Sequence, residues 1–295
     1  MILAFDLGGT EIKSALINDN SEIEENFAPF SSPDNLESLF DIMDKLINHS
    51  LDKIQGIAIS CPGKVDTKCG IIYFGGMLTF LHECPIKNIL ESRYGLPVAV
   101  INDAKAAVLA EMTTGYLQGI DNGLAMVLGS GLGGGIVING KLYQGSHYQA
   151  GELSFLLPFL SEKMTIEDFL GMKFSAVSMI SDCSEALGLK DKKNGYLIFD
   201  HIVKKDERVY PIFQKYCRLL AIYITNLQSI LDVERIVIGG GISSQDILIE
   251  EIEKQLDQLQ KEEDVAFFNI ERPKIVACKH KNDANLIGAA CSFKI

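Results

Sequence analysis

The sequence has few basic residues and lacks a long hydrophobic run. Lys and Arg number 27 against 39 Asp and Glu, which gives a formal net charge of −12 at pH 7. Nucleic acids and anionic membranes repel such a chain unless it has a local basic patch, and the densest basic stretch, 190–193, is short and interrupted by Asp191. The longest apolar candidate, 219–238, is broken by polar and charged residues, unlike the ~20 apolar residues of a membrane helix. We therefore expect no nucleic-acid or membrane partner.

Cysteines with the spacing of a metal site are also missing. The seven cysteines are odd in number and scattered, and the pattern C-x-x-C does not occur. This argues against a disulfide framework and against a zinc cage, and it fits a reducing compartment. The first residues carry no positive charge before Asp6, which is not the pattern of a secretory signal. The sequence predicts a cytoplasmic protein.

Length and composition predict a folded chain of two domains. The chain has 295 residues, and ~150 residues per domain gives about two domains. Hydrophobic residues make up 47% and charged residues 22%, enough for a sizeable core. The order strand, glycine turn, strand occurs at 2–17 and again at 124–138. We expect an α/β protein with two similarly built domains that face a cleft, divided near 115–123, where the pattern restarts.

Hydrophobic periodicity places these motifs on strands and helices. A helix is predicted from Ser32-Pro33, because proline suits a first turn and an apolar stripe follows to Ile47. The pair Asn139-Gly140 is typical of a type I′ hairpin turn. Further helices are predicted at 104–112 and 219–231, and strands at 2–6, 12–17, 54–60, 98–101, 124–128, 136–138, 235–238 and 274–278.

The first glycine turn is a candidate phosphate site. Gly8 and Gly9 separate two strands, so backbone N–H groups can reach phosphate oxygens without an intervening Cβ, and Thr10 adds a hydroxyl. Asp6, just before the turn, can hold Mg²⁺ through water, because this ion dehydrates reluctantly. The alternative is an ordinary hairpin whose turn requires positive φ, and these residues alone do not decide between the two.

The second glycine turn, 129–135, matches G-x-G-x-x-G and therefore raises a dinucleotide-binding fold. That fold needs a helix after the glycines. Here the strand 136–138 and a hairpin turn follow, so a second phosphate-binding hairpin fits better than a dehydrogenase.

Three further places could carry chemistry, and two of them also have a structural alternative. At a strand-to-helix junction Asp103 could accept the proton of an attacking hydroxyl, whereas capping of the helix is the more common role; the two agree if Asn102 supplies the cap. Glu152 could accept hydrogen bonds from vicinal sugar hydroxyls. The glycines at 239–241 could let a flat ring such as adenine approach the backbone, or could serve tight packing.

The order and types of these motifs resemble those of the ROK family (repressors, uncharacterised frames and sugar kinases), which belongs to the actin-like ATPase superfamily. The resemblance runs along the whole chain. Its motifs are the first phosphate motif 6–10, the sugar-side loop 61–66, the catalytic-aspartate stretch 102–111, the second phosphate motif 128–140, the Gly-Glu sugar motif 151–152, the adenosine motif 238–242 and the C-terminal signature 283–290.

The resemblance implies two actin-like (ribonuclease H-like) ATPase domains: 1–117, completed by the C-terminal helix 283–295, and 118–282. It implies an ATP- and Mg²⁺-dependent kinase, usually a homodimer, that phosphorylates the 6-OH of a hexose-class sugar such as glucose, N-acetylmannosamine or a β-glucoside. Asp103 would be the base. Sugar-binding residues would be Gly63, Asn102, Asp103, Glu152 and Glu167, and cofactor-binding residues would be Asp6, Gly8, Gly9, Thr10, Lys13, Gly129, Ser130, Gly131, Gly133, Gly134, Gly239, Gly240, Gly241 and Ile242.

The sequence departs from the family pattern in two places. Most members have a histidine three residues after the Gly-Glu pair, which contacts both the sugar and a structural zinc, and here Phe155 occupies that position. The cysteine-rich zinc loop is replaced by 156–163, which contains no cysteine. The chain therefore resembles a zinc-free minority of the family, and the identity of the sugar stays open.

Two rival functions remain to be weighed. Transcriptional regulators of the family carry a helix-turn-helix before the first phosphate motif, whereas here that motif begins at residue 6 of an acidic chain. A non-catalytic sugar-binding or regulatory protein is the alternative to the kinase. Retention of Asp6, Asp103 and both glycine turns favours the kinase.

Overall fold

The structure is a computed structural model that describes residues 1–157, 165–262 and 270–294. The chain divides into two compact units. Unit 1 comprises Met1–Gly119, Leu142–Ala150 and Asn282–Ile295, and unit 2 comprises Ile120–Lys141 and Gly151–Lys281. The domain limits given above, 1–117 with 283–295 and 118–282, stay a prediction.

Unit 1 is built on a mixed sheet. The strand order is β3 (Ile23–Asn26), β2 (Glu11–Ile17), β1 (Ile2–Leu7), β5 (Gly56–Cys61) and β8 (Val98–Asn102), and β4 (Phe30–Ser31) also pairs with β2. The β1–β2 hairpin is antiparallel, whereas β1, β5 and β8 are parallel. A separate ribbon joins β6 (Lys64–Asp66) to β7 (Ile71–Tyr73). The helices are α1 (Leu36–Ser50), α2 (Ile86–Tyr94), α3 (Asp103–Thr114) and α10 (Ala284–Cys291), with short 3-10 turns at Thr79–Leu81, Lys281–Asp283 and Ser292–Lys294.

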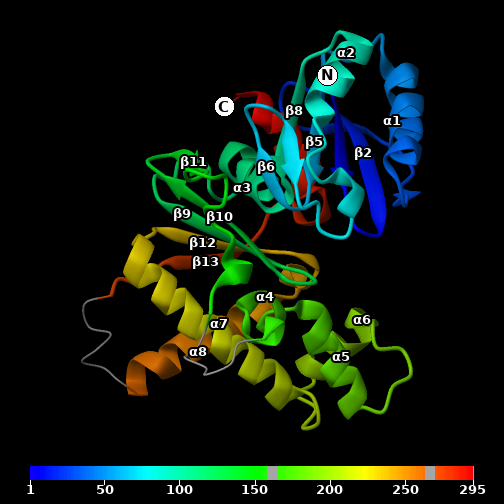
Figure 1. Cartoon of the computed structure of the whole chain (residues 1–295). Helices are drawn as coiled ribbons and strands as arrows, with labels where there is room; N and C mark the ends of the chain where they lie inside the picture. The colour runs from blue at the N-terminus through cyan, green and yellow to red at the C-terminus, as the bar shows by residue number, and fades with distance from the viewer. Residues whose placement is uncertain (158–164, 263–269, 295) are drawn as a thin grey trace. The chain divides into compact units, whose positions relative to one another are not determined.

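Successive side chains of β1 point to opposite faces of this sheet. Leu3, Phe5 and Leu7 are buried in one cluster with apolar residues of α1. Asp6 lies on the other face, where it contacts the C-terminal helix α10. Figure 1 shows α1 and α10 (red) on opposite sides of the sheet. The C-terminal helix thus reaches β1 next to the first glycine turn.

The helix predicted from Ser32-Pro33 begins later than expected. Asn35 is the N-cap of α1, because its side chain accepts a hydrogen bond from Ser38 N at 2.9 Å. Ser32 instead joins the first glycine turn, where its Oγ donates to the Gly8 carbonyl at 2.6 Å. The prediction was wrong by one turn, since a contact 24 residues away holds Ser32 outside the helix.

Unit 2 also has a mixed sheet, and helices pack against it. The strand order is β11 (Lys141–Tyr143), β10 (Leu132–Ile138), β9 (Gly123–Leu128), β12 (Arg235–Gly239) and β13 (Lys274–Ala277). The helices are α4 (Leu170–Lys173), α5 (Ala176–Ala186), α6 (Gly195–Val203), α7 (Tyr210–Leu231) and α8 (Asp246–Glu262), with 3-10 turns η2 (Leu153–Phe155), η3 (Ile166–Asp168) and η4 (Gly241–Ser244). Apolar residues of α7 and α8 share one buried cluster with β9 and β12, and both helices lie along the same face of the sheet (Figure 1).

The second glycine turn is shorter than the predicted turn, 129–135. β10 begins at Leu132, which pairs with Leu128, so only 129–131 form the turn and the following glycines belong to the strand. The predicted strand at 136–138 is therefore the end of a longer one. The type I′ turn is confirmed, because Asn139 (φ 51°) and Gly140 (φ 68°) both have positive φ.

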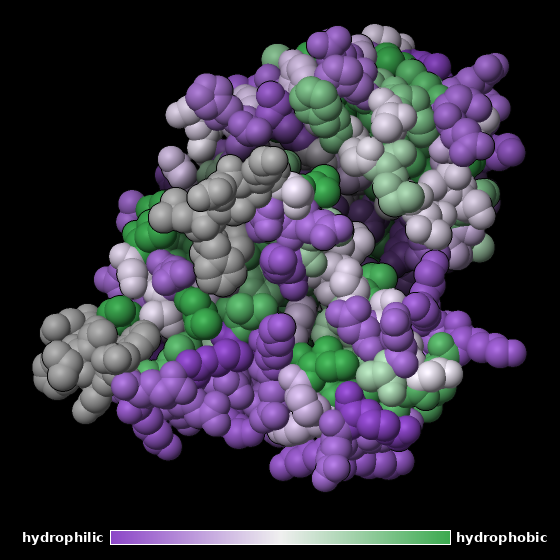
Figure 2. Space-filling view, turned by 60° about the horizontal axis from the view of Figure 1, so that its bottom comes forward, coloured by the Kyte–Doolittle hydropathy of each residue, from purple (hydrophilic) through white to green (hydrophobic). Residues whose placement is uncertain are grey.

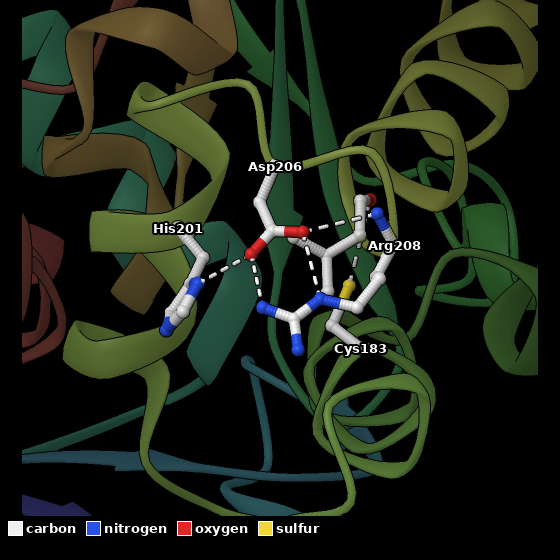
Figure 3. A network of polar contacts seen from close by, with 5 residues as sticks. Cys183, His201, Asp206 and Arg208 are labelled. Atoms are coloured by element: carbon white, nitrogen blue, oxygen red, sulfur yellow. Dashed lines mark hydrogen bonds and ion pairs between the residues drawn. The ribbon is translucent and has the colours of Figure 1, made fainter.

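The connection between α6 and α7 is fixed by Asp206 (Figure 3). Its carboxylate accepts hydrogen bonds from Arg208 Nε at 2.9 Å and Arg208 N at 3.1 Å, and His201 Nδ1 lies 2.8 Å from it. The hydrogen bonds from Arg208 and from His201 lower the pKa of Asp206. The network therefore stabilises the entry into the central helix of unit 2.

Hydrophobic residues on the face turned to the viewer in Figure 2 form small groups separated by hydrophilic side chains. In the described part of the chain, no helix has the length and apolar character needed to cross a bilayer. All seven cysteines carry free thiols, and six of them are buried.

Candidate active site

Asp6 lies at the carboxyl end of β1 and is held by two neighbouring elements of unit 1. Its Oδ1 accepts a hydrogen bond from Ser60 Oγ on β5 at 2.9 Å, and Asn285 Nδ2 on α10 lies 3.2 Å from each carboxylate oxygen. Burial raises the pKa of Asp6, and the hydrogen bonds from Ser60 and Asn285 oppose this rise. The sequence analysis did not identify Ser60 or Asn285. Ser60 stands opposite Asp6 in the parallel pairing of β1 with β5, which the sequence alone does not reveal.

The first glycine turn is crowded rather than conformationally unusual. Neither Gly8 nor Gly9 has positive φ, so the hairpin alternative that required it does not apply here. A Cβ on Gly8 would lie 2.7 Å from the Glu11 carbonyl oxygen, and one on Gly9 would lie 2.8 Å from Met77 Sδ. Thr10 next to them is exposed. The Lys13 ammonium, on β2 opposite Asp6, lies 3.4 Å from Glu11. A side chain at Gly8 would therefore clash with backbone, whereas at Gly9 the exposed Met77 side chain could move aside.

Asn102 caps the helix that begins with Asp103, as predicted. Asn102 Oδ1 accepts from Lys105 N at 3.2 Å, and its Nδ2 donates to the Gly63 carbonyl at 3.0 Å. Asp103 is half-buried, and its Oδ1 accepts from Ala104 N at 2.8 Å. Gly63 has φ +90°, and a Cβ there would lie 2.0 Å from Phe74 O. Three of the predicted sugar-side residues are thus brought together in unit 1.

Lys105 is a buried cation that the sequence analysis did not single out. It lies on α3 two residues after Asp103 with 1% of its surface exposed. Its Nζ donates to the Tyr148 carbonyl at 2.5 Å, and Thr67 Oγ1 donates to Gln144 Oε1 at 3.2 Å. These contacts hold the segment 142–150, which directly precedes the Gly-Glu pair, against α3 and against the turn between β6 and β7. A lysine flanked by alanines on a core helix was the only local signal.

In unit 2 the second glycine turn is open where the first is crowded. Gly129 N donates to the Gly131 carbonyl at 3.0 Å, and a Cβ on Gly129 would meet nothing within 4 Å. Ser130 at the tip is exposed. Gly133 and Gly134 lie on β10 instead, and a Cβ on Gly134 would lie 2.6 Å from Leu153 Cδ1. Gly129 also accepts a hydrogen bond from Ala176 N at 2.9 Å, so the exposed part of this turn is its tip at Ser130. The absence of a side chain at Gly134 leaves room for Leu153 of η2.

Glu152 and Glu167 belong to neighbouring short turns of unit 2. Gly151 has φ +82° and approaches Gly135, and half-buried Glu152 follows it directly before η2. Exposed Glu167 lies in η3, which a capping box between Thr165 and Asp168 stabilises.

An edge-to-face contact joins the segments of these two carboxylates. The rings of Phe155 and Phe169 lie 6.3 Å apart between centroids, at 86°. Leu170 N also donates to the Leu156 carbonyl at 2.9 Å. The two segments that carry the predicted sugar carboxylates therefore pack against each other.

The region of the expected zinc loop is only partly described. Residues 158–164, which make up most of the segment 156–163, lie outside the described residues. Among the described residues, no group of three or more His, Cys, Asp or Glu side chains could hold a metal ion. The zinc-free subgroup stays a prediction.

The third glycine cluster combines the two alternatives that the sequence left open. β12 ends at Gly239, and Gly240 has φ +94° with its Cβ position 2.0 Å from the Leu128 carbonyl oxygen. A Cβ on Gly241 would meet nothing within 4 Å. Ile242 is buried. Gly240 therefore serves tight packing, whereas Gly241 leaves backbone open to a ligand.

These adjacent glycines give a matched pair of variants. Gly240→Ala is expected to lower the free energy of unfolding by about 2–3 kcal/mol, because the methyl group clashes with Leu128 O and the left-handed conformation strains alanine. Gly241→Ala is expected to change it by less than about 0.5 kcal/mol, since the space is open. Urea denaturation of both variants measures the difference, and equal midpoints would contradict the packing assigned to Gly240.

Comparison with known proteins extends over the whole chain. The model of the ROK family matches residues 2–159 and 179–294. A β-glucoside kinase of Listeria monocytogenes is 30% identical over 298 residues, which cover 99% of this chain and 97% of that protein. A glucokinase of Halalkalibacterium halodurans is 31% identical over 316 residues, covering 98% and 93%.

Solved structures give the same α/β fold. A ROK family protein from Streptococcus pneumoniae in complex with sucrose superposes with a TM-score of 0.87 at 29% identity, covering 99% of this chain and 97% of that one. A ROK family glucokinase from Streptomyces griseus in complex with glucose and AMPPNP gives 0.83 at 23% identity, covering 98% and 97%. The chain therefore belongs to the ROK family, as a sugar kinase.

Proposed function

We propose that the chain transfers the γ-phosphate of ATP to the 6-OH of a hexose-class sugar, with Asp103 as the base. The observation that carries the proposal is the division of labour at the start of α3. Asn102 caps the helix and binds Gly63, so the cap does not depend on the Asp103 carboxylate. The helix N-terminus favours the negative charge of the form that accepts a proton.

The proposal assigns the nucleotide to the glycine turns. The turns 8–10 and 129–131 bind phosphate oxygens through N–H groups other than those of Gly8 and Gly129, which donate to the carbonyls of Glu11 and Gly131. The open backbone at Gly241 accepts the adenosine. Asp6 fits a role in holding Mg²⁺ through water, because its carboxylate is fixed by Ser60 and Asn285 rather than by a cation. Bound Mg²⁺ supplies neutralisation of phosphate charge.

On the sugar side, the proposal assigns hydroxyl recognition to Gly63, Asn102, Glu152 and Glu167. Carboxylate and amide oxygens accept hydrogen bonds from vicinal hydroxyls, which orients the ring. The sugar O6 then forms a bond to the γ-phosphorus while the bond from that phosphorus to the β–γ bridging oxygen breaks. The hydroxyl proton passes to Asp103 and ADP leaves. Catalysis of phosphoryl transfer depends mainly on positioning the reactants and on neutralising the charge of the phosphates.

The substrate class follows from the relatives and stays a proposal. Glucose, N-acetylmannosamine and β-glucosides are the candidates, and the β-glucoside kinase and glucokinase relatives support the first and the last of them. The residues proposed to bind the sugar lie at the ends of strands and in short turns. Such positions can differ between proteins of one fold that act on different substrates.

ADP release across a sugar panel tests the proposal. The full chain is supplied with Mg·ATP and, in turn, with hexoses, N-acetylhexosamines and β-glucosides, and the same assay with excess EDTA removes the metal. We expect sugar-dependent turnover that EDTA abolishes. Binding of sugar or ATP by calorimetry without turnover on any sugar would instead support a non-catalytic sugar-binding protein.

A further inference from the structure

Met77 is an exposed methionine whose side chain lies on the first glycine turn. The residue is 78% exposed. Its Sδ, Cβ and Cγ atoms nevertheless lie 2.8, 3.1 and 3.3 Å from the position that a Cβ on Gly9 would occupy. The side chain therefore runs along the backbone of a turn that we propose binds phosphate, and the rest of its surface faces solvent.

The residues around Met77 hold its backbone in this place. Phe74 has φ +54°, its N–H donates to His82 Nδ1 at 3.4 Å, and its ring stacks on the His82 ring with the centroids 4.5 Å apart. Gly76 has φ +62°, and its N–H donates to the Phe74 carbonyl at 2.7 Å. Leu78, directly after Met77, is buried. Because a left-handed phenylalanine is unfavourable by itself, these contacts determine the conformation of the loop 74–77.

The other end of the loop 74–77 contacts the proposed sugar side of the same unit. A Cβ on Gly63 would lie 2.0 Å from the Phe74 carbonyl oxygen, so the two backbones touch there. The Gly63 carbonyl accepts from Asn102 Nδ2 at 3.0 Å, and the proposed base Asp103 follows Asn102. The loop therefore joins the first glycine turn to the start of α3, all within unit 1.

We infer that Met77 keeps water away from the γ-phosphate and so lowers the hydrolysis of ATP in the absence of sugar. This inference rests on the proposed function, because it takes the first glycine turn as a phosphate site and Asp103 as the base. Without a sugar, water can react in its place. The water oxygen then forms a bond to the γ-phosphorus, the bond to the β–γ bridging oxygen breaks, and a proton passes to Asp103, which gives ADP and phosphate.

The chemistry of a methionine side chain suits this role. A thioether donates no hydrogen bond and accepts only weakly, so Met77 offers little to hold a water beside the phosphate. Most of the side chain stays in water, so its burial contributes little to folding. Its unbranched, flexible chain can also move off Gly9 when the nucleotide enters the turn.

The coupling of ADP release to sugar phosphorylation tests the inference. ADP release by the full chain is measured with Mg·ATP alone, and ADP and sugar phosphate are measured together after addition of glucose or methyl β-D-glucoside. For Met77→Ala we expect ADP release without sugar to rise about tenfold, and ADP formed per sugar phosphate to exceed that of the wild type. Met77→Leu restores an apolar side chain of similar volume and should retain the low rate of the wild type.

Leu51→Ala is the matched control, because Leu51 is an apolar residue of unit 1 that is 44% exposed. It directly follows α1, and four residues later Gln55 N donates to the Met1 carbonyl, whereas the glycine turn follows the other end of β1. This variant should release ADP without sugar at the wild-type rate. The same unchanged rate in Met77→Ala would overturn the inference. A higher KM for ATP without faster hydrolysis would mean that Met77 binds the nucleotide instead, which also overturns it.

Failure of the proposed function gives a different result. If the wild type phosphorylates neither sugar, ADP release with Mg·ATP alone is still compared in the wild type and in Met77→Ala. Faster release in the variant upholds the exclusion of water by Met77 although the kinase proposal has failed. Equal release, or none from either protein, overturns it.

Discussion

Asp103→Asn is expected to lower kcat by about 10²- to 10⁴-fold, the range that general-base catalysis contributes. Asparagine has nearly the shape of aspartate, so sugar and ATP should still bind, but the amide cannot accept the hydroxyl proton. The fold should be retained because Asn102, and not Asp103, caps α3. The expected signature is therefore a loss in kcat with little change in KM.

Three measurements separate this chemistry from damage to the structure. The melting temperature of Asp103→Asn should match that of the wild type, and calorimetric dissociation constants for sugar should agree within about twofold. Asn102→Ala is the comparison, since it removes the cap and the contact to Gly63 and should cost about 1 kcal/mol of stability. Normal turnover of Asp103→Asn would remove Asp103 from the mechanism.

The junction at 102–103 was predictable because its interactions are local. An Asx residue between a buried strand and an alanine-rich helix predicts a cap, and the structure has that cap within three residues. The type I′ turn at Asn139-Gly140 was predictable for the same reason, since the pair itself sets the positive φ values.

The glycines of β10 were misread because their cause is distant in the chain. A run of glycines indicates a turn when only neighbours are considered. Gly134 is instead needed because Leu153 packs against it, and Gly135 because Gly151 approaches it. Neither contact leaves a mark within a window of ten residues, so the strand was predicted to begin four residues late.

The partners of Asp6 were missed for a related reason. Ser60 is 54 residues away and Asn285 is 279 residues away, so neither is visible without the strand pairing and the return of the C-terminal helix. Sequence motifs identified the carboxylate, whereas the tertiary fold determines what holds it. Ser32 on the Gly8 carbonyl is another case, and it also displaced the start of α1.

The return of that helix makes Gly288 a position where one added methyl group would clash with backbone. Gly288 lies inside α10, and a Cβ there would lie 1.7 Å from the Ala106 carbonyl oxygen of α3. Glycine to alanine in a helix interior ordinarily stabilises by about 1 kcal/mol, because alanine has the higher helix propensity. Here the clash is with backbone, which cannot move aside as a flexible side chain can, so Gly288→Ala should destabilise unit 1 by about 3 kcal/mol or more.

The opposite signs of propensity and clash make the experiment decisive. Urea denaturation should show a lower midpoint for Gly288→Ala. Ala289→Gly on the same helix should lose about 1 kcal/mol of helix propensity and about 1 kcal/mol more for the buried methyl group of Ala289, without any clash. Because α10 carries Asn285, a shifted helix would also loosen its contact with the Asp6 carboxylate, so kcat should fall in any Gly288→Ala protein that remains folded. A midpoint equal to or above that of the wild type would show that α3 and α10 do not approach this closely, and the placement of Asn285 on Asp6 would fail with it.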